Sequence, residues 1–336
     1  LQLALKNPKQ VITFLSFSCT GATTDNIIDK VKSAKENLSK IFPKDFNNVD
    51  LNDVIDGKDM FNKRYNRVAP QLELLDKTLK GKREIDLLLL STGGNDIGFA
   101  KYVMNVLINS KVANIITKQA SVETEYEVKN TLGKNYNRLN SVIHNKSLLF
   151  ENDTRRVILT AYPNIINDEN GKLCKEITNT VFKIPFGESK GINRALKLQN
   201  IDQYLIKPLY KIQKDLTDML SWSFVDSHLK LYDKHGFCAK KYNDKYIIPS
   251  KEKKDDKWQP FSPKDYSKYN EKQRWVNIPL DSMLKINMTK KSIFGDTDLG
   301  FSDETSGIMH PTAEGLAITA NENVDFICKN KLIDCK

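Results

Sequence analysis

The sequence lacks any run of about 18 consecutive apolar residues, the length that a helix needs to cross a bilayer. We therefore expect no transmembrane segment. It also lacks internal repeats and a Gly-rich phosphate loop, and the second absence argues against a nucleotide-binding protein. What is present is typical of a globular protein with a sizeable core, because 40% of the 336 residues are hydrophobic and 28% are charged.

Cysteine is scarce, and none of the five cysteines belongs to a Cys-x-x-Cys pair. The His-x-x-Cys segment that ends at Cys238 has no second pair at zinc-finger spacing, so we expect no metal site. An odd number of cysteines predicts a free thiol or a partner outside this sequence. If the protein is exported, Cys174 with Cys238 and Cys328 with Cys335 are candidate disulfides, although sequence alone does not determine the pairing. The remaining cysteine is Cys19.

Acidic residues are fewer than basic ones, 42 against 52, which leaves a formal net charge of +10. Charges of both signs are interleaved along the chain, so we interpret the basic excess as a solvated, Lys-rich surface. Peripheral contact with an anionic membrane or glycan surface stays open as the alternative. We expect no nucleic-acid partner.

Short apolar runs alternate with longer segments of helical periodicity. The runs are typical of buried strands, and the clearest helical segments are at about 190–220 and 313–328. This alternation predicts an α/β fold in which helices cover both faces of a parallel sheet. In such a sheet, the ligand site lies at the carboxyl ends of the strands. The predicted strands are Val11–Phe17, Ile85–Leu90, Arg156–Ala161 and Ser223–Asp226.

Residues 230–305 differ from the rest of the chain. They are rich in Lys, Asp, Tyr and Trp and have little periodic apolar pattern. We interpret them as an insertion on the surface of a single domain that spans residues 1–336, where they form a wall or lid of the site. A loosely packed loop is the alternative.

Two turns of small residues follow predicted strands. In the first, Ser18–Thr24, Gly21 lets a backbone N–H approach a ligand closely. In the second, Gly93–Asp96, Asn95 can aim its side-chain amide into the site, where such a donor stabilises the oxyanion formed when an acyl carbonyl is attacked. Each turn taken alone is equally typical of an ordinary turn or helix cap.

Histidine is rare, and His310 stands in the segment Gly307–Gly315, G-I-M-H-P-T-A-E-G. Its place before a proline at a predicted helix start puts it at a loop edge. Imidazole is the usual general base for activating a hydroxyl, although a lone loop histidine is more often inert. His228 follows a predicted strand end, and we interpret it as a surface residue, with a supporting position beside the site as the alternative.

Taken in order, the three segments and Ala161–Asn164 resemble the SGNH hydrolases, also called GDSL esterases and lipases, from Val11 to about Val324. The resemblance implies a three-layer α/β/α sandwich with a flavodoxin-like sheet. It implies hydrolysis of a carboxylic ester (lipid, small ester or acetylated glycan) through an acyl-serine intermediate, with no metal or organic cofactor. It further implies that the Gly21 N–H and the Asn95 amide form the oxyanion hole, and that His310 is the general base and acid.

Two further segments, His235–Cys238 and Arg274–Val276, are similar to the exported bacterial branch of this family. We therefore expect a secreted or periplasmic protein. The first residues carry no signal-peptide pattern and no Met precedes Leu1, so we expect the chain to be processed or truncated.

The nucleophile is the main departure from the family pattern. The family serine belongs to a Gly-Asp-Ser motif that precedes the first of these turns, and residues 1–10 contain no Gly, Asp or Ser. Without the strand that carries this motif, a slot in the middle of the sheet would be unfilled, leaving backbone groups unpaired. We therefore expect that N-terminal residues are absent from this sequence.

Two alternatives to an absent serine remain open. In the first alternative, the motif is permuted and Thr297 is the nucleophile, within the segment Phe294–Gly300 (F-G-D-T-D-L-G). The second is a non-catalytic protein of the same fold that binds a ligand or glycan. The family acid usually stands three residues before the histidine, where this chain has Gly307, so we expect a backbone carbonyl to orient His310 instead.

Overall fold

The computed structural model describes Leu3, Lys6 and residues 11–18, 22–30, 32–33, 67–80, 84–99, 127–174, 201–239, 274–277 and 310–335. Its elements are α2 (Thr24–Ile28), β1 (Lys32–Ser33), β2 (Arg67–Val68), α5 (Gln71–Leu79), β3 (Leu88–Leu90), η1 (Glu127–Leu132), α8 (Gly133–Asn145), η2 (Phe150–Asn152), η3 (Thr154–Arg156), β4 (Val157–Thr160), η4 (Asp202–Ile206), α10 (Lys207–Met219), β5 (Ser223–Val225), α11 (His228–Tyr232) and α14 (Ala313–Lys329).

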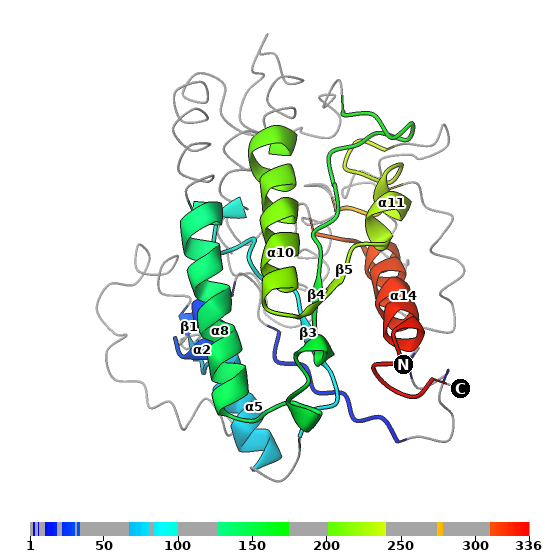
Figure 1. The fold of residues 1–336 in the computed structure, drawn as a ribbon. Helices are drawn as coiled ribbons and strands as arrows, with labels where there is room; N and C mark the ends of the chain where they lie inside the picture. The colour runs from blue at the N-terminus through cyan, green and yellow to red at the C-terminus, as the bar shows by residue number, and fades with distance from the viewer. Residues whose placement is uncertain are drawn as a thin grey trace, which may run out of the picture.

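Strands β3, β4 and β5 form a parallel sheet in that order, with helices beside it (Figure 1). The register places Leu89 of β3 beside Ile158 of β4. These strands lie within the runs predicted at 85–90, 156–161 and 223–226. The predicted α/β class with a parallel sheet is therefore confirmed. Strands β1 and β2 form a separate antiparallel pair.

Alternate residues of β4 pack on opposite faces of the sheet. Val157 and Leu159 are fully buried in the larger core cluster, to which α8 and α10 contribute. Ile158 joins a smaller cluster with Val225 of β5 and Ile327 of α14. Figure 1 shows α8 and α10 on one side of the strands and α14 on the other. Burial of each such side chain stabilises the fold by about 1.5–3 kcal/mol, which is why the sheet needs helices on both faces.

Local sequence explains the two long helices on either side of the sheet. In α10 a proline occupies the first turn, where its missing N–H costs nothing, and Leu209, Gln213 and Thr217 form one buried face at a spacing of four residues. In α14 the Thr312 hydroxyl accepts a hydrogen bond from the Gly315 N–H and caps the helix start. Both predicted helices are confirmed where the structure describes them.

The strand predicted at Val11–Phe17 is wrong. Residues 11–18 form no strand, and Val11 and Phe14 are 93% and 75% exposed. Strand-forming residues need a neighbouring backbone to pair with, and β3 has a paired neighbour on one edge only among the described residues. Leu89, in the middle of β3, is 49% exposed.

Most of the predicted insertion at 230–305 lies outside the described residues. The parts that the structure describes are 230–239 and 274–277, and both pack against the body of the protein. Trp275 and Val276 are buried there. The interpretation of the remainder as a lid stays a prediction.

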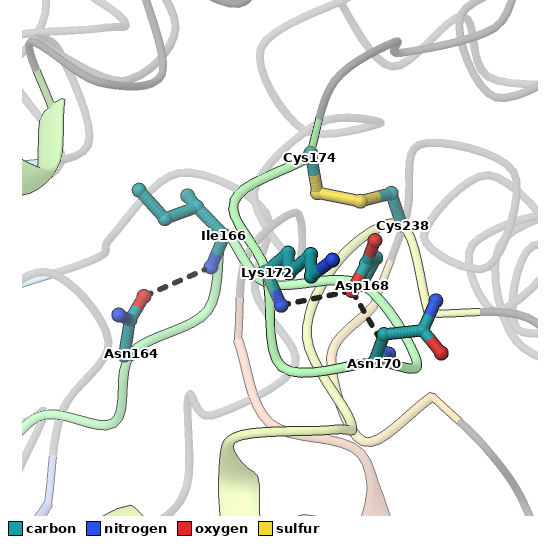
Figure 2. Close-up of a disulfide and its surroundings, with 7 residues drawn as sticks. All are labelled: Asn164, Ile166, Asp168, Asn170, Lys172, Cys174 and Cys238. Carbon is teal, nitrogen blue, oxygen red and sulfur yellow. Dashed lines mark hydrogen bonds between the residues drawn. A yellow bond between two sulfur atoms is a disulfide. The ribbon is translucent and has the colours of Figure 1, made fainter.

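A disulfide between Cys174 and Cys238 joins the loop after β4 to the loop after α11 (Figure 2). Within the first loop, Asp168 Oδ1 accepts hydrogen bonds at 2.9 Å from the N–H groups of Asn170 and Lys172. The Cys174 N–H donates to the Ile166 carbonyl at 2.9 Å. The second disulfide joins Cys328, in the last turn of α14, to Cys335 after the helix, so both candidate pairings are confirmed.

We expect Gly236→Ala to destabilise the protein by about 3 kcal/mol, because this glycine lies against backbone that has no room to move. A Cβ at Gly236 would contact the Asn167 carbonyl and lie 2.6 Å from the Asn167 nitrogen. Gly133→Ala is the control, because the nearest atom to its added Cβ, on Leu216, is 3.7 Å away. Alanine in a helix should stabilise that position slightly. Equal unfolding free energies of the two variants in urea would contradict this packing.

Candidate functional site

The candidate site lies at the carboxyl ends of the three parallel strands, where the sequence predicts it. The turn Gly93–Asp96 follows β3, Tyr162 follows β4, and α11 follows β5. The loop that carries His310 leads into α14, which contacts both β5 and α11. Because the strands are adjacent and parallel, the segments that directly follow them share one edge of the sheet.

Asn95 is exposed at this edge and contacts the other predicted turn. Its Nδ2 donates a hydrogen bond to the carbonyl of Ala22 at 2.9 Å, across 73 residues of sequence. Gly21 itself lies outside the described residues, but Ala22 is its neighbour in the chain. The structure therefore brings the side-chain donor predicted at Asn95 next to the segment of the predicted backbone donor.

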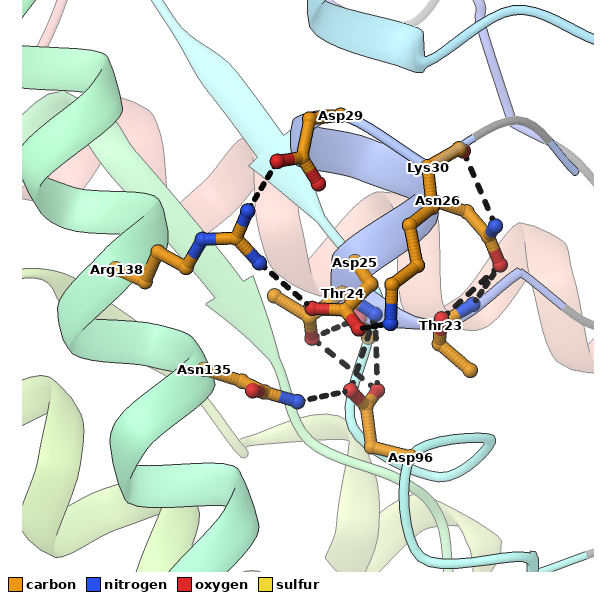
Figure 3. A network of polar contacts seen from close by, with 10 residues as sticks. Thr23, Thr24, Asp25, Asn26, Asp29, Lys30, Asp96, Asn135 and Arg138 are labelled. Atoms are coloured by element: carbon orange, nitrogen blue, oxygen red, sulfur yellow. Dashed lines mark hydrogen bonds and ion pairs between the residues drawn. The ribbon is translucent and has the colours of Figure 1, made fainter.

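Asp96 anchors the same two turns more deeply (Figure 3). Both of its carboxylate oxygens lie 3.1 Å from the Thr24 nitrogen, and Oδ2 also accepts from the Thr24 hydroxyl at 3.1 Å. Asn135 of α8 donates to Oδ1 at 2.8 Å. From local sequence this turn is equally typical of an ordinary turn or helix cap, because nothing in it shows that the partners of Asp96 come from α2 and α8.

Helix α8 also holds α2 in place. Arg138 pairs with Asp25 at 3.0 Å and with Asp29, and Lys30 pairs with Asp25 as well. Thr24, at the start of α2, is completely buried, and its hydroxyl lies 3.1 Å from that of Thr92. The start of α2 is therefore tied both to the end of β3 and to α8.

The first glycine of the β3 turn is required by its surroundings. Gly93 has a φ of +109°, and a Cβ there would lie 2.7 Å from the Tyr136 hydroxyl. That hydroxyl and the Gln213 amide donate to the Thr92 carbonyl at 2.8 and 2.9 Å. Burial raises the pKa of Tyr136 well above 10.0, so the phenol remains a hydrogen-bond donor at any physiological pH.

Tyr162 packs on the second glycine of this turn. The Gly94 N–H donates to the Tyr162 hydroxyl at 3.2 Å, and a Cβ on Gly94 would lie 2.9 Å from the ring. Phe99 stacks with the Tyr162 ring, with the two centroids 6.1 Å apart. The Gly94 N–H therefore has a partner, whereas the exposed Asn95 amide carries a second N–H beyond the one that it donates to Ala22. From the sequence, Tyr162 belongs only to the segment Ala161–Asn164, and its contact with Gly94 is not predicted.

His310 is exposed on the loop before α14 and is fixed through its backbone. Its carbonyl accepts from the Asn277 N–H at 2.9 Å, and the Trp275 carbonyl accepts from the Thr312 N–H at 2.8 Å. The Trp275 N–H in turn donates to the His235 carbonyl at 2.9 Å. The segment 274–277 therefore lies between the loop after α11 and the loop of His310, a function for this part of the insertion that local sequence does not reveal.

Aromatic side chains reinforce the same contact. The rings of His235 and Trp275 stack with centroids 3.6 Å apart, and Trp275 meets Tyr232 edge to face at 5.4 Å. Gly315 permits α14 to approach them, because a Cβ there would contact the Tyr232 hydroxyl and lie 2.7 Å from the Trp275 carbonyl. The loop of His310 is thus supported by a packed core rather than by solvent-exposed contacts.

Three residues of the predicted site lie outside the described residues: Gly21, the alternative nucleophile Thr297, and Gly307. Their predicted functions stay predictions, as does the orientation of His310 by a backbone carbonyl.

His228 is completely buried, so its interpretation as a surface residue is wrong. Its Nε2–H donates to the Ala161 carbonyl at 2.9 Å, which links the start of α11 to the end of β4. Its Nδ1 has no hydrogen-bond partner in the described part of the chain. Desolvation lowers the pKa of His228 below 6.5, and the Ala161 carbonyl, Asp226 and Glu322 oppose this shift only in part.

We expect this histidine to make the fold sensitive to acid. Because its pKa is lower in the folded state, the unfolded chain binds the proton more readily, and stability falls as the pH falls below 6.5 toward the folded pKa. His228→Gln keeps a donor for Ala161 but cannot be protonated. Thermal unfolding between about pH 7 and pH 5 should therefore show a smaller loss of Tm in this variant than in the wild type. If Tm falls equally with pH in both proteins, His228 is not the source of the acid sensitivity.

Among the described residues, no group of three or more His, Cys, Asp or Glu side chains could hold a metal ion. Among those same residues, the helices are all too short or too polar to cross a membrane.

No protein-family model matches the sequence, and no curated protein matches it. Phospholipase A1 from Streptomyces albidoflavus NA297 is similar in structure, with a TM-score of 0.33 and 18% sequence identity over 50% of this chain and 60% of that chain. This chain therefore spans less than two thirds of the phospholipase. The extracellular lipase from Streptomyces rimosus is also similar, with a TM-score of 0.38 and 12% identity over 73% of this chain and 71% of that chain. The structural similarity to these two Streptomyces proteins is distant.

Proposed function

We propose that the protein hydrolyses carboxylic esters at the carboxyl edge of its sheet. The observation that carries the proposal is the hydrogen bond from Asn95 Nδ2 to the Ala22 carbonyl. It joins two turns that are far apart in sequence and that each supply one of the donors needed for an oxyanion hole. The third component, His310, belongs to a braced loop at the same edge.

The proposed reaction has two halves. A hydroxyl nucleophile attacks the ester carbonyl while His310 takes its proton, and the resulting oxyanion accepts hydrogen bonds from Asn95 and from the Gly21 N–H. Collapse of this intermediate expels the alcohol, which receives the proton from His310. Water then attacks the acyl-enzyme by the same route and regenerates the hydroxyl. The resemblance calls for a serine nucleophile, and Thr297 is the alternative.

We further propose that the protein works outside the cytoplasm, in a secreted or periplasmic location. Its two disulfides support this, because such bonds persist in oxidising compartments. The substrate class, whether lipid, small ester or acetylated glycan, follows from the resemblance and is part of the proposal.

The test is incubation of the full-length protein, including any residues that precede Leu1, with a fluorophosphonate, followed by intact-mass analysis and peptide mapping. We expect one adduct, and its position identifies the nucleophile. Ser141→Ala is the control: Ser141 is exposed on α8, where its hydroxyl donates to the Asn137 carbonyl, and its loss should leave labelling unchanged. If the adduct disappears in that control, the labelled residue is not the nucleophile of the proposed site. Absence of both an adduct and p-nitrophenyl ester hydrolysis would contradict ester hydrolysis and favour a non-catalytic binding protein.

A further inference from the structure

We infer that Asp96 is a positioning residue that holds the proposed oxyanion donor Asn95 in place relative to the segment Ala22–Thr24. The inference rests on the proposed function. Asp96 is the chain neighbour of Asn95, and its partner Thr24 stands three residues after Gly21. The hydrogen bonds from Thr24 to the Asp96 carboxylate therefore link the turn Ser18–Thr24 to the turn Gly93–Asp96.

The contact between Asp96 and Thr24 is the stronger of the two links between these turns. It comprises the Thr24 N–H and hydroxyl, each 3.1 Å from a carboxylate oxygen, and Thr24 is fully buried. Hydrogen bonds to a carboxylate are about twice as strong as those between neutral groups. The other link, from Asn95 to Ala22, is a single exposed hydrogen bond between neutral groups. The geometry of the turns therefore depends on Asp96.

Helix α8 determines how the carboxylate is turned. Asn135 donates to Oδ1 at 2.8 Å, which leaves Oδ2 directed at the Thr24 hydroxyl (Figure 3). One helical turn further along α8, Arg138 holds α2 through Asp25 and Asp29. Arg138 thus stabilises the same region through carboxylates other than Asp96 (Figure 3), which makes it a matched control.

Three variants separate positioning from general stability: D96N, the exchange D96N/N135D, and R138Q. An amide at position 96 puts a donor in place of one carboxylate oxygen, although both oxygens face the Thr24 N–H and one also faces the Asn135 amide. It also removes the charge that strengthens these hydrogen bonds. In the exchange variant, the new amide at position 96 accepts from Thr24 and donates to the new carboxylate at position 135, so every group has a partner again. R138Q weakens the hold on α2 and leaves Asp96 and Asn135 intact.

Two measurements are made on the full chain: kcat and KM for p-nitrophenyl butyrate, and the side-chain amide resonance of Asn95 in protein labelled with ¹⁵N-asparagine. In D96N we expect kcat to fall about 10- to 100-fold with KM little changed, because a misplacement of about 1 Å costs on this order. The Asn95 resonance should shift. D96N/N135D should recover most of the kcat and the original resonance, whereas R138Q should lower Tm and change neither.

The outcomes distinguish this inference from the proposed function. If D96N lowers Tm but leaves kcat and the Asn95 resonance unchanged, Asp96 has only a structural function and the inference is overturned. The same follows if R138Q lowers kcat as much as D96N. If the wild type neither hydrolyses the ester nor forms a fluorophosphonate adduct, the proposed function fails. The resonance of Asn95 still tests whether Asp96 positions this side chain.

Discussion

Replacing His310 with alanine is expected to lower kcat by a factor on the order of 10⁴ or more while the protein stays folded. The imidazole is the only proposed group that moves the proton in both halves of the reaction, so its loss affects every proton transfer. The side chain is exposed, and surface substitutions usually change stability by about 0.5 kcal/mol or less. The backbone hydrogen bond from Asn277 to the carbonyl at position 310 survives the substitution.

Steady-state kinetics with p-nitrophenyl butyrate, together with circular dichroism, test this expectation. His144→Ala is the control, because His144 is an exposed histidine near the end of α8, away from the strand ends that form the site. Its kcat should equal that of the wild type. A His310→Ala variant that retains wild-type turnover would remove this residue from the mechanism.

Replacing Asn95 with alanine is expected to lower kcat by about 10²- to 10³-fold. The amide is proposed to stabilise charge that develops only after the carbonyl is attacked, so the loss should fall on kcat rather than on KM. Stability should change little, because the hydrogen bond to Ala22 is exposed and is worth about 1 kcal/mol.

Asn137→Ala provides a control of the same chemical kind. Its side-chain amide also donates to a backbone carbonyl at 2.9 Å, that of Gly133, and it is exposed on α8. Removing it should leave kcat unchanged. If Asn95→Ala and Asn137→Ala have the same kcat, Asn95 is not an oxyanion donor, and the hydrogen bond to Ala22 serves only to join the two turns.

The apolar pattern of the sequence predicted three strands correctly and one wrongly. The runs at 85–90, 156–161 and 223–226 contain strands because central parallel strands are buried on both faces and tolerate continuous apolar sequence. The run at 11–17 is also mostly apolar, yet most of its residues are exposed and it forms no strand. Pairing depends on a neighbouring strand, which is information that a local window of sequence does not contain.

Some residues of the candidate site were predictable from the sequence, whereas the contacts around them were not. Asn95 and His310 were identified from short motifs, since the residue types that stabilise an oxyanion or move a proton are few and their turns are recognisable. The contacts that support them were not predictable. Asp96 finds Thr24 at a separation of 72 residues, and the loop of His310 is braced by Trp275. Such partners are chosen by the packing of helices on the sheet.

The sequence by itself determined the α/β class, three of the strands, the two long helices and the residue types of the candidate chemistry, because these follow from periodicity, composition and short motifs. Only the tertiary structure decided which cysteines pair, that His228 is buried, and that Asp96 and Tyr162 fix the turn that presents Asn95. The physical reason is that each of these depends on contacts between segments distant in the chain, whose energies arise only when the core is packed.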